Sequence, residues 1–307
     1  MDNKITKKRL SNFLAYEWIL IIVISVLAVF CWEVVYSLAS VRISTGQAFD
    51  YYYDTTVDST NDTAFKNLFG FEKDGNVFSY DLLEFRSEKL SSDFNVLAMR
   101  LGSHIGDAII TSTTVKEDAP EGTVSNAQNI INNHPVYTVD QLLADAETYL
   151  KKFLKDGVSG ADAHLVADNL DNQKMEDNFK RLSGDNRTRA GLITKADEVK
   201  RIKDLCNEVK DFKYLTENCD IFYTAKVPVK EGEQDIGATA RYGLAPEKLT
   251  GGQKSASTFF RAVENASGTA QGTAVLVFNF TDYQPDMQFE SITFLNTIVR
   301  NCSNLLG

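Results

Sequence analysis

Residues 97–112 read LAMRLGSHIGDAIITS and are the stretch that points most directly to the fold. The first five carry apolar side chains at helical spacing, and the glycines that follow are typical of a helix end. The last six, from Asp107 to Ser112, are short, apolar and rich in β-branched residues, which predicts a buried strand. A helix that leads directly into a buried strand is one unit of an α/β fold.

The residues before this stretch continue the alternation of strand and helix. We expect strands at 47–57 and 77–85, a helix at 60–69 that Gly70 ends, and a second helix that Ser92 caps. The order β-α-β-α-β within some 70 residues favours a parallel sheet with right-handed crossovers.

The residues after it are first helical and then alternate again. Thr138 and Gln141 have the spacing of a capping box, and a helix follows to about residue 154. The remaining expectations are a loop at 119–135, helices at 194–215, 259–263 and 289–305, and strands at 221–229, 238–244 and 273–280. This order predicts a two-lobed α/β body with a parallel sheet and a helical middle section. Lobe 1 comprises residues 47–118 and 270–307, and lobe 2 comprises residues 136–265.

The membrane segment is the clearest local signal. No charge interrupts Trp18 to Trp32, and ten Ile, Leu, Val and Phe residues in this run contribute roughly −3 to −6 kcal/mol to insertion. Glu33 would oppose insertion by about 2.5 to 3.5 kcal/mol only at the bilayer centre, and here it lies at the interface. We therefore expect a transmembrane helix at residues 13–41, with Trp18 and Trp32 in the two headgroup belts as membrane anchors.

The flanking charges predict the orientation. The first 42 residues hold five of the 32 basic and three of the 42 acidic residues, which leaves 27 basic and 39 acidic residues for the rest. Basic residues before the span favour a cytoplasmic tail at residues 1–12, and we expect residues 43–307, with a net charge of −12, to be extracellular. The protein is then single-pass in the cell membrane, and the lipid bilayer is its first partner.

A cleaved signal peptide is the alternative for the same segment. Ser37, Leu38 and Ala39 have the small residues of a cleavage site, but Trp32 and Glu33 are a poor approach to one. A lipid anchor at Cys31 is disfavoured because Val29 and Phe30 precede it. The body is exported in each case.

The composition and the motifs exclude several functions. A formal charge of −10 argues against binding to nucleic acid. Three histidines 30 residues apart predict no metal site, and the loop Gly251 to Ser255 lacks the glycine spacing of a phosphate loop. We expect no catalytic residues, no cofactor and no enzymatic activity. Three cysteines lie outside the apolar span, and both a disulfide between Cys206 and Cys219 and free thiols are open for them.

A ligand, if one is bound, is expected where the strands end. In open α/β sheets ligands bind beyond the carboxyl ends of the strands. Hydroxyl, guanidinium and aromatic groups there would suit a sugar or another small neutral molecule, although turns favour the same residue types. The candidate ligand-binding residues are Asp54, Thr55, Arg86, Ser87, Thr111, Ser112, Asn279, Asp282 and Tyr283.

Several phrases of the body resemble one family. The stretches Val77–Phe85, Asp107–Ser112, Arg241–Leu244 and Ala274–Phe280 are similar to strands of bacterial extracellular solute-binding proteins with the periplasmic-binding-protein fold. The stretch Leu101–Ile110 is similar to a helix end that leads into a strand in the same family. The resemblance implies a membrane-anchored receptor for sugars or small metabolites, linked to the permease of an ATP-driven importer (an ABC transporter). The alternative is a non-catalytic accessory or scaffold protein of a transporter or envelope complex that binds no solute. An extracellular enzyme is a third class, for which no residue spacing supplies a site.

Overall fold

The computed structural model of this chain describes residues 7–39, 47–54, 56–57, 61–71, 77–78, 82–90, 95–115, 118–158, 165–179, 186–229, 237–263, 269–279 and 289–306. The chain forms two compact units, the first of which comprises residues 1–42 and 182–192. The second comprises residues 43–181 and 193–307, and we call it the body.

The first unit contains the long helix α1 (Lys7–Ala39) and the short helix α7 (Asn186–Arg189). Within α1, the 21 residues Trp18–Leu38 have a mean hydropathy of 2.6, and none of them is buried. At 1.5 Å per residue this segment is about 31 Å long, which matches the hydrocarbon core of a bilayer. The structure therefore confirms one apolar helix of membrane-spanning length, a property that an uncleaved signal sequence shares.

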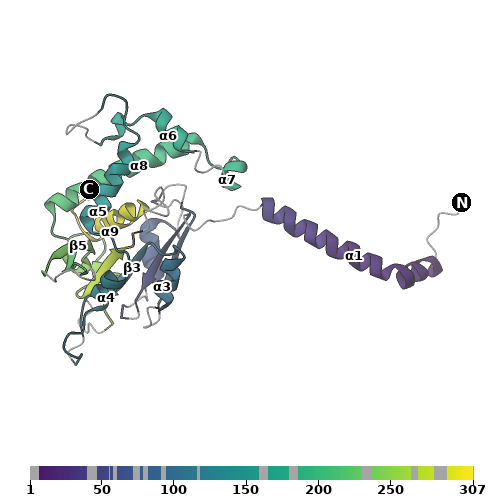
Figure 1. The fold of residues 1–307 in the computed structure, drawn as a ribbon, viewed down its shortest axis with the longest axis horizontal. Coiled ribbons are helices and arrows are strands. Elements are labelled where there is room, and N and C mark those ends of the chain that lie inside the picture. The colour runs from purple at the N-terminus through teal and green to yellow at the C-terminus, as the bar shows by residue number, and fades with distance from the viewer. Residues whose placement is uncertain are drawn as a thin grey trace. The chain divides into compact units, whose positions relative to one another are not determined.

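The body is built on one mixed sheet whose strands follow the order β2-β1-β3-β6-β5-β4 (Figure 1). Strands β1, β2 and β3 are parallel, and each of the pairs β3–β6, β6–β5 and β5–β4 is antiparallel. The bounds are β1 Ala48–Tyr53, β2 Glu84–Lys89, β3 Ala108–Ser112, β4 Phe222–Lys226, β5 Thr239–Leu244 and β6 Thr273–Val277. We call the edge at which β1, β2 and β3 end the carboxyl edge.

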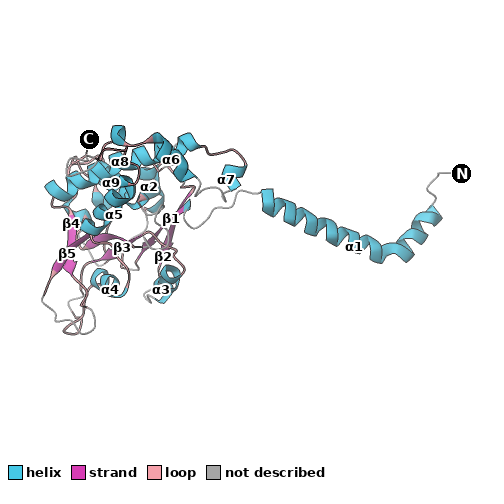
Figure 2. Cartoon of the chain, turned by 45° about the horizontal axis from the view of Figure 1, so that its top comes forward, coloured by secondary structure: helices cyan, strands magenta, loops and turns pink. Residues whose placement is uncertain are grey.

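Helices cover both faces of this sheet (Figure 2). The larger core lies under α5 (Val139–Lys151), α8 (Lys195–Asn218) and α9 (Glu290–Cys302), and it contains a cluster of aromatic rings around Phe85 and Phe294. The smaller core lies under α3 (Asn95–Gly102) and α4 (Asn126–Asn133). The remaining helices are α2 (Asp62–Lys66), α6 (Asn172–Asn178) and the 3₁₀ turns Asn67–Phe69, Ala167–Asn169, Pro246–Lys248 and Ala256–Thr258.

The mixed α/β class is confirmed, whereas the expectation of a parallel sheet holds only for the pairs β1–β2 and β1–β3. The other described strand pairs are antiparallel. Strands β4 and β5 fall in the range expected for lobe 2, yet they belong to the same sheet as β1, β2 and β3. The described strands thus form one sheet, and a two-lobed body stays a prediction.

Three local expectations also need correction. Strand β2 begins at Glu84, so the apolar residues Phe78 and Leu82 are buried from the segment that precedes it. The expected loop at 119–135 contains α4, which Ser125 caps by accepting a hydrogen bond from the Gln128 backbone. The expected helix at 259–263 is only the 3₁₀ turn Ala256–Thr258. Cys206 and Cys219 are free thiols in the structure, as are Cys31 and Cys302.

Candidate functional site

Asp54 lies at the carboxyl edge, directly after β1, and its side chain is bonded to its own chain. One carboxylate oxygen accepts hydrogen bonds from Thr111 Oγ1 at 2.8 Å and from Asn126 Nδ2 at 2.6 Å. The other oxygen accepts from the Thr56 backbone N–H at 3.1 Å. Asp54 is only 2% exposed, and these bonds replace the hydrogen bonds to water that its carboxylate loses on burial. The structure brings Asp54 and Thr111 together as predicted, but as bonded neighbours.

Ser112, at the end of β3, has a similar role. Its hydroxyl shares a hydrogen bond of 2.7 Å with the Thr114 hydroxyl and accepts one of 3.1 Å from the Thr114 backbone. Ser112 is 3% exposed. The described candidate residues at this edge, Asp54, Thr111 and Ser112, are therefore buried and hydrogen-bonded within their own chain.

Asn279 lies at the opposite edge of the sheet from Asp54. It follows β6, which is antiparallel to β3, so the end of β6 is level with the start of β3. Its backbone N–H donates to the Pro135 carbonyl at 2.7 Å. The rule that groups the carboxyl ends of strands does not apply to a reversed strand, and the structure does not bring Asn279 to Asp54. Thr55, Asp282 and Tyr283 lie outside the described residues.

Arg86 and Ser87 lie in the middle of β2, because that strand continues to Lys89. The Arg86 guanidinium holds Asp50 with two contacts, Nε to Oδ1 at 2.8 Å and Nη2 to Oδ2 at 3.1 Å. The Ser87 hydroxyl donates to Asp62 Oδ2 at 2.8 Å. These two candidate residues are thus held by different elements, β1 and α2.

A cavity of about 390 Å³ adjoins Arg86 and Ser87, and we call it the β2 cavity. Its charges are paired, since Arg86 binds Asp50 and Arg100 binds Glu88 at 3.0 Å. Burial raises the pKa of Asp50 in spite of the nearby Arg86. The complete lining is Asp50, Tyr51, Tyr52, Arg86, Ser87, Glu88, Arg100 and Ile105.

Asp107 directly precedes β3 and contacts Asp50, which lines this cavity. It accepts a hydrogen bond of 2.7 Å from the Asp50 backbone. Burial raises the pKa of Asp107 to about 8, although that bond opposes the shift. A carboxyl group with this pKa exchanges a proton near neutral pH, but a raised pKa alone does not define a catalytic site.

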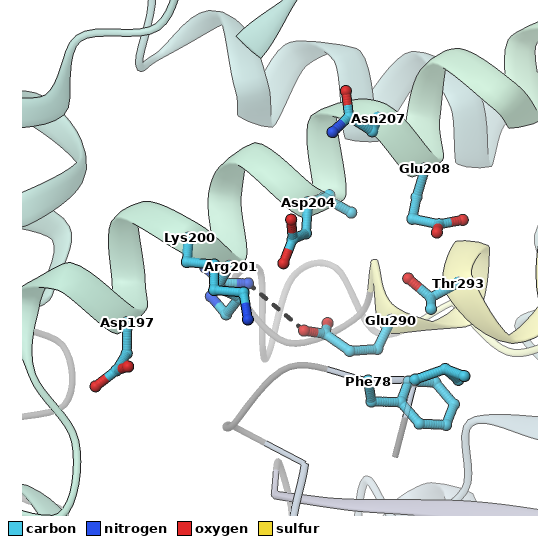
Figure 3. Close-up of a pocket in the computed structure, with 11 residues that line it drawn as sticks. Phe78, Asp197, Lys200, Arg201, Asp204, Asn207, Glu208, Glu290 and Thr293 are labelled. Carbon is cyan, nitrogen blue, oxygen red and sulfur yellow. Dashed lines mark ion pairs between the residues drawn. The ribbon is translucent and has the colours of Figure 1, made fainter. Parts of the chain in front are cut away.

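A second cavity, of about 320 Å³, lies between α8 and α9 (Figure 3), and we call it the α8–α9 pocket. One face of α8 supplies most of its polar side chains, at spacings of three and four residues. Its lining is Val77, Phe78, Asp197, Lys200, Arg201, Asp204, Leu205, Asn207, Glu208, Glu290 and Thr293. The sequence did not single out these residues, because a charged stripe on a helix is ordinarily a solvated face.

Arg201 lines this pocket and is only 2% exposed. Its Nε and Nη2 donate to the two carboxylate oxygens of Glu198 at 3.0 and 3.1 Å, and Nη2 also donates to the Tyr149 hydroxyl at 2.8 Å. Its Nη1 forms an ion pair of 3.6 Å with Glu290, the dashed line in Figure 3. Glu198, which is fully buried, also accepts from Asn178 Nδ2 at 2.6 Å. These partners offset the desolvation of both charges.

The described residues contain no group of three or more His, Cys, Asp or Glu side chains that is placed to hold a metal ion. A comparison of the chain with known proteins found no matching family model, no matching curated protein and no matching solved structure.

Proposed function

We propose that this protein is a membrane-anchored, non-catalytic accessory or scaffold protein, and that its body docks on a transporter or another envelope complex. The hydrogen bonding of Asp54 carries this proposal. At the edge where an open α/β sheet would bind its ligand, Thr111, Asn126 and Thr56 occupy the carboxylate. A sheet edge closed by its own side chains suits a body that acts through its surface.

Helix α1 supplies the anchor in this proposal, with the short basic tail in the cytoplasm and the body outside the cell. Its 21-residue apolar span matches the thickness of a bilayer, and the basic residues before the span follow the positive-inside rule. Anchoring concentrates the body at the membrane surface, where a permease or another envelope protein would be its partner.

Purification of the tagged full-length chain from cross-linked native membranes tests this proposal. We expect one membrane protein to be recovered in a fixed ratio to the chain. A matched variant, in which an unrelated transmembrane helix replaces residues 13–41, should retain that partner if the body makes the contact. Recovery of the full-length chain without any partner in a fixed ratio contradicts the proposal.

The second candidate is a solute-binding protein of an ATP-driven importer, with a two-lobed body as the resemblance implies. The β2 cavity favours it, because a space of about 390 Å³ adjoins Arg86 and Ser87, which the sequence marks as ligand residues. A thermal-shift screen of sugars and small metabolites on the full-length chain tests this candidate. We expect a ligand that stabilises the wild type and not Arg86→Gln, with Lys89→Gln on the same strand as the control. Equal shifts for all three chains, or none, contradict it.

A further inference from the structure

Two charged side chains of opposite sign in the α8–α9 pocket form no ion pair or hydrogen bond with the described residues. Asp197 is occupied by the capping box of α8, where it accepts from the Thr194 backbone at 2.6 Å. Glu208 is occupied by Arg300, at 2.9 and 3.0 Å, and by Asn296. Among the described residues, no ion pair or hydrogen bond holds the side chain of Lys200 or Asp204.

Lys200 and Asp204 lie four residues apart on α8, a spacing at which opposite charges often meet. The lysine precedes the acid, which is the less favourable order along a helix, and the two groups are not within ion-pair distance. Figure 3 shows the Asp204 carboxylate directed toward the space between Arg201 and Glu290. Partial burial raises the pKa of Asp204, and Lys200 only partly offsets this effect. The carboxylate therefore faces the pocket without an ion pair or a hydrogen bond to the described residues.

The rest of the lining limits the kind of ligand. Val77, Phe78 and Leu205 offer apolar contact, and the Asn207 amide is also without a hydrogen bond to the described residues. A volume of about 320 Å³ is at the small end of ligand sites and suits a small molecule. The buried pair of Arg201 and Glu198 fixes the floor of the pocket before any ligand arrives.

We propose that the α8–α9 pocket binds a small zwitterion of the amino-acid type, with its ammonium group at Asp204 and its carboxylate at Lys200. Such a ligand bridges two charges that the helix itself does not join, and its apolar part contacts Phe78. Ion pairs with two neighbouring charges of opposite sign select for a zwitterion over a simple amine or a simple acid. The lining of this pocket shares no residue with that of the β2 cavity, and binding here makes an anchored accessory protein responsive to a solute.

Calorimetry on the full-length chain in detergent micelles tests this inference. The probes are the twenty proteinogenic amino acids, with ethanolamine and propionate as single-charge analogues. We expect at least one amino acid to bind, and both analogues to bind about tenfold more weakly or not at all. Asp204→Asn and Lys200→Gln should each weaken that binding by about tenfold or more.

Two exposed residues of the same helix provide matched controls. Lys210→Gln and Glu217→Gln remove one charge of each sign from α8 outside the pocket, and binding to these variants should be unchanged. Binding that Asp204→Asn and Lys200→Gln leave intact overturns the inference, as does binding of ethanolamine as tight as that of any amino acid. Absence of binding by every probe, in a chain whose unfolding transition shows that it is folded, also overturns it.

Discussion

Helices α1 and α8 are the two longest helices that the structure describes, and their apolar side chains are distributed in opposite ways. α1 has 33 residues and an apolar span of which no residue is buried. α8 has 24 residues and many charges, yet it buries a stripe that includes Ile202, Val209 and Phe212. An apolar surface on all sides of a helix suits lipid, whereas an apolar stripe on one side suits a protein core.

Charge shows the same contrast. α8 buries Glu198 and Arg201 because each finds partners within hydrogen-bond distance. With α1 assigned to a bilayer, a charge at the centre of its apolar span would lie in hydrocarbon without such partners. The ion pair of α8 is therefore tolerated in a protein core, whereas a central charge in α1 would oppose insertion.

Removal of one member of the buried pair should have the largest effect. Arg201→Met leaves Glu198 buried without its main counter-charge, and we expect a loss of about 3–5 kcal/mol of unfolding free energy. Urea unfolding of the full-length chain in detergent measures this loss. The double variant Glu198→Gln with Arg201→Met should recover most of it.

An exposed pair provides the control for that prediction. Lys248→Ala breaks the Lys248–Asp220 contact of 2.8 Å, whose aspartate side chain is 93% exposed, and a hydrogen bond of 3.1 Å from the same ammonium group to the Phe222 carbonyl. Its effect should be below about 1 kcal/mol. If Arg201→Met is no more disruptive than Lys248→Ala, α8 does not depend on its buried ions and the contrast with α1 fails.

A charge in the centre of α1 should have the next largest effect. Leu27→Lys opposes insertion by about 2.5–3.5 kcal/mol, and the fraction of the chain in membranes should fall accordingly. Leu38→Lys at the end of the span places the same charge near the interface and should change that fraction little. Equal membrane fractions for both variants contradict the assignment of α1 to the bilayer.

Asp54→Ala removes the acceptor of the carboxyl edge and should have a smaller effect. Thr111 and Asn126 lose their partner, and we expect a loss of about 1–3 kcal/mol of unfolding free energy. Asp54→Asn keeps one acceptor oxygen and should lose less. A ligand-binding role without a structural one predicts instead that Asp54→Ala leaves the unfolding free energy unchanged.

Asp107 should give the smallest effect, in the pH dependence of stability. Its folded pKa of about 8 lies above the ordinary aspartate value of 3.8, so between these values the folded chain retains a proton that the unfolded chain has lost. The stability that this group contributes is therefore present at low pH and is lost as the pH rises toward 8. The Tm of the wild type should fall between pH 6 and 8, and in Asp107→Asn this fall should be smaller by about one to a few degrees. Identical pH profiles for both chains contradict the assignment.

The sequence predicted the elements whose apolar pattern is clear. The apolar span of α1, the buried strand after Asp107, and α8 with its Thr194 cap lie where the pattern places them. Strand β2 was placed too early because an edge strand with the sequence EFRSEK has no apolar alternation to mark it. The helix α4 was missed because Asn-rich composition suggests a loop, whereas Ile130 and Ile131 are its buried side.

The candidate site was less predictable because it depends on strand direction and on packing. The position of Asn279 follows from the reversal of β6, which no local pattern reports. The contact of Asp54 with Asn126 joins residues 72 positions apart, on an element that was expected to be a loop. Lys200 and Asp204 line a cavity because α9 packs beside α8, and this packing joins residues that are distant in the sequence.

Alkaline carbonate extraction of membranes from cells that produce the chain tests the central claim, that α1 holds the body on a bilayer, most directly. We predict that the full-length chain stays in the membrane pellet, that residues 43–307 alone are released, and that Leu27→Lys shifts the full-length chain toward the soluble fraction. Release of the intact full-length chain by carbonate, to the same extent as residues 43–307, would contradict the account.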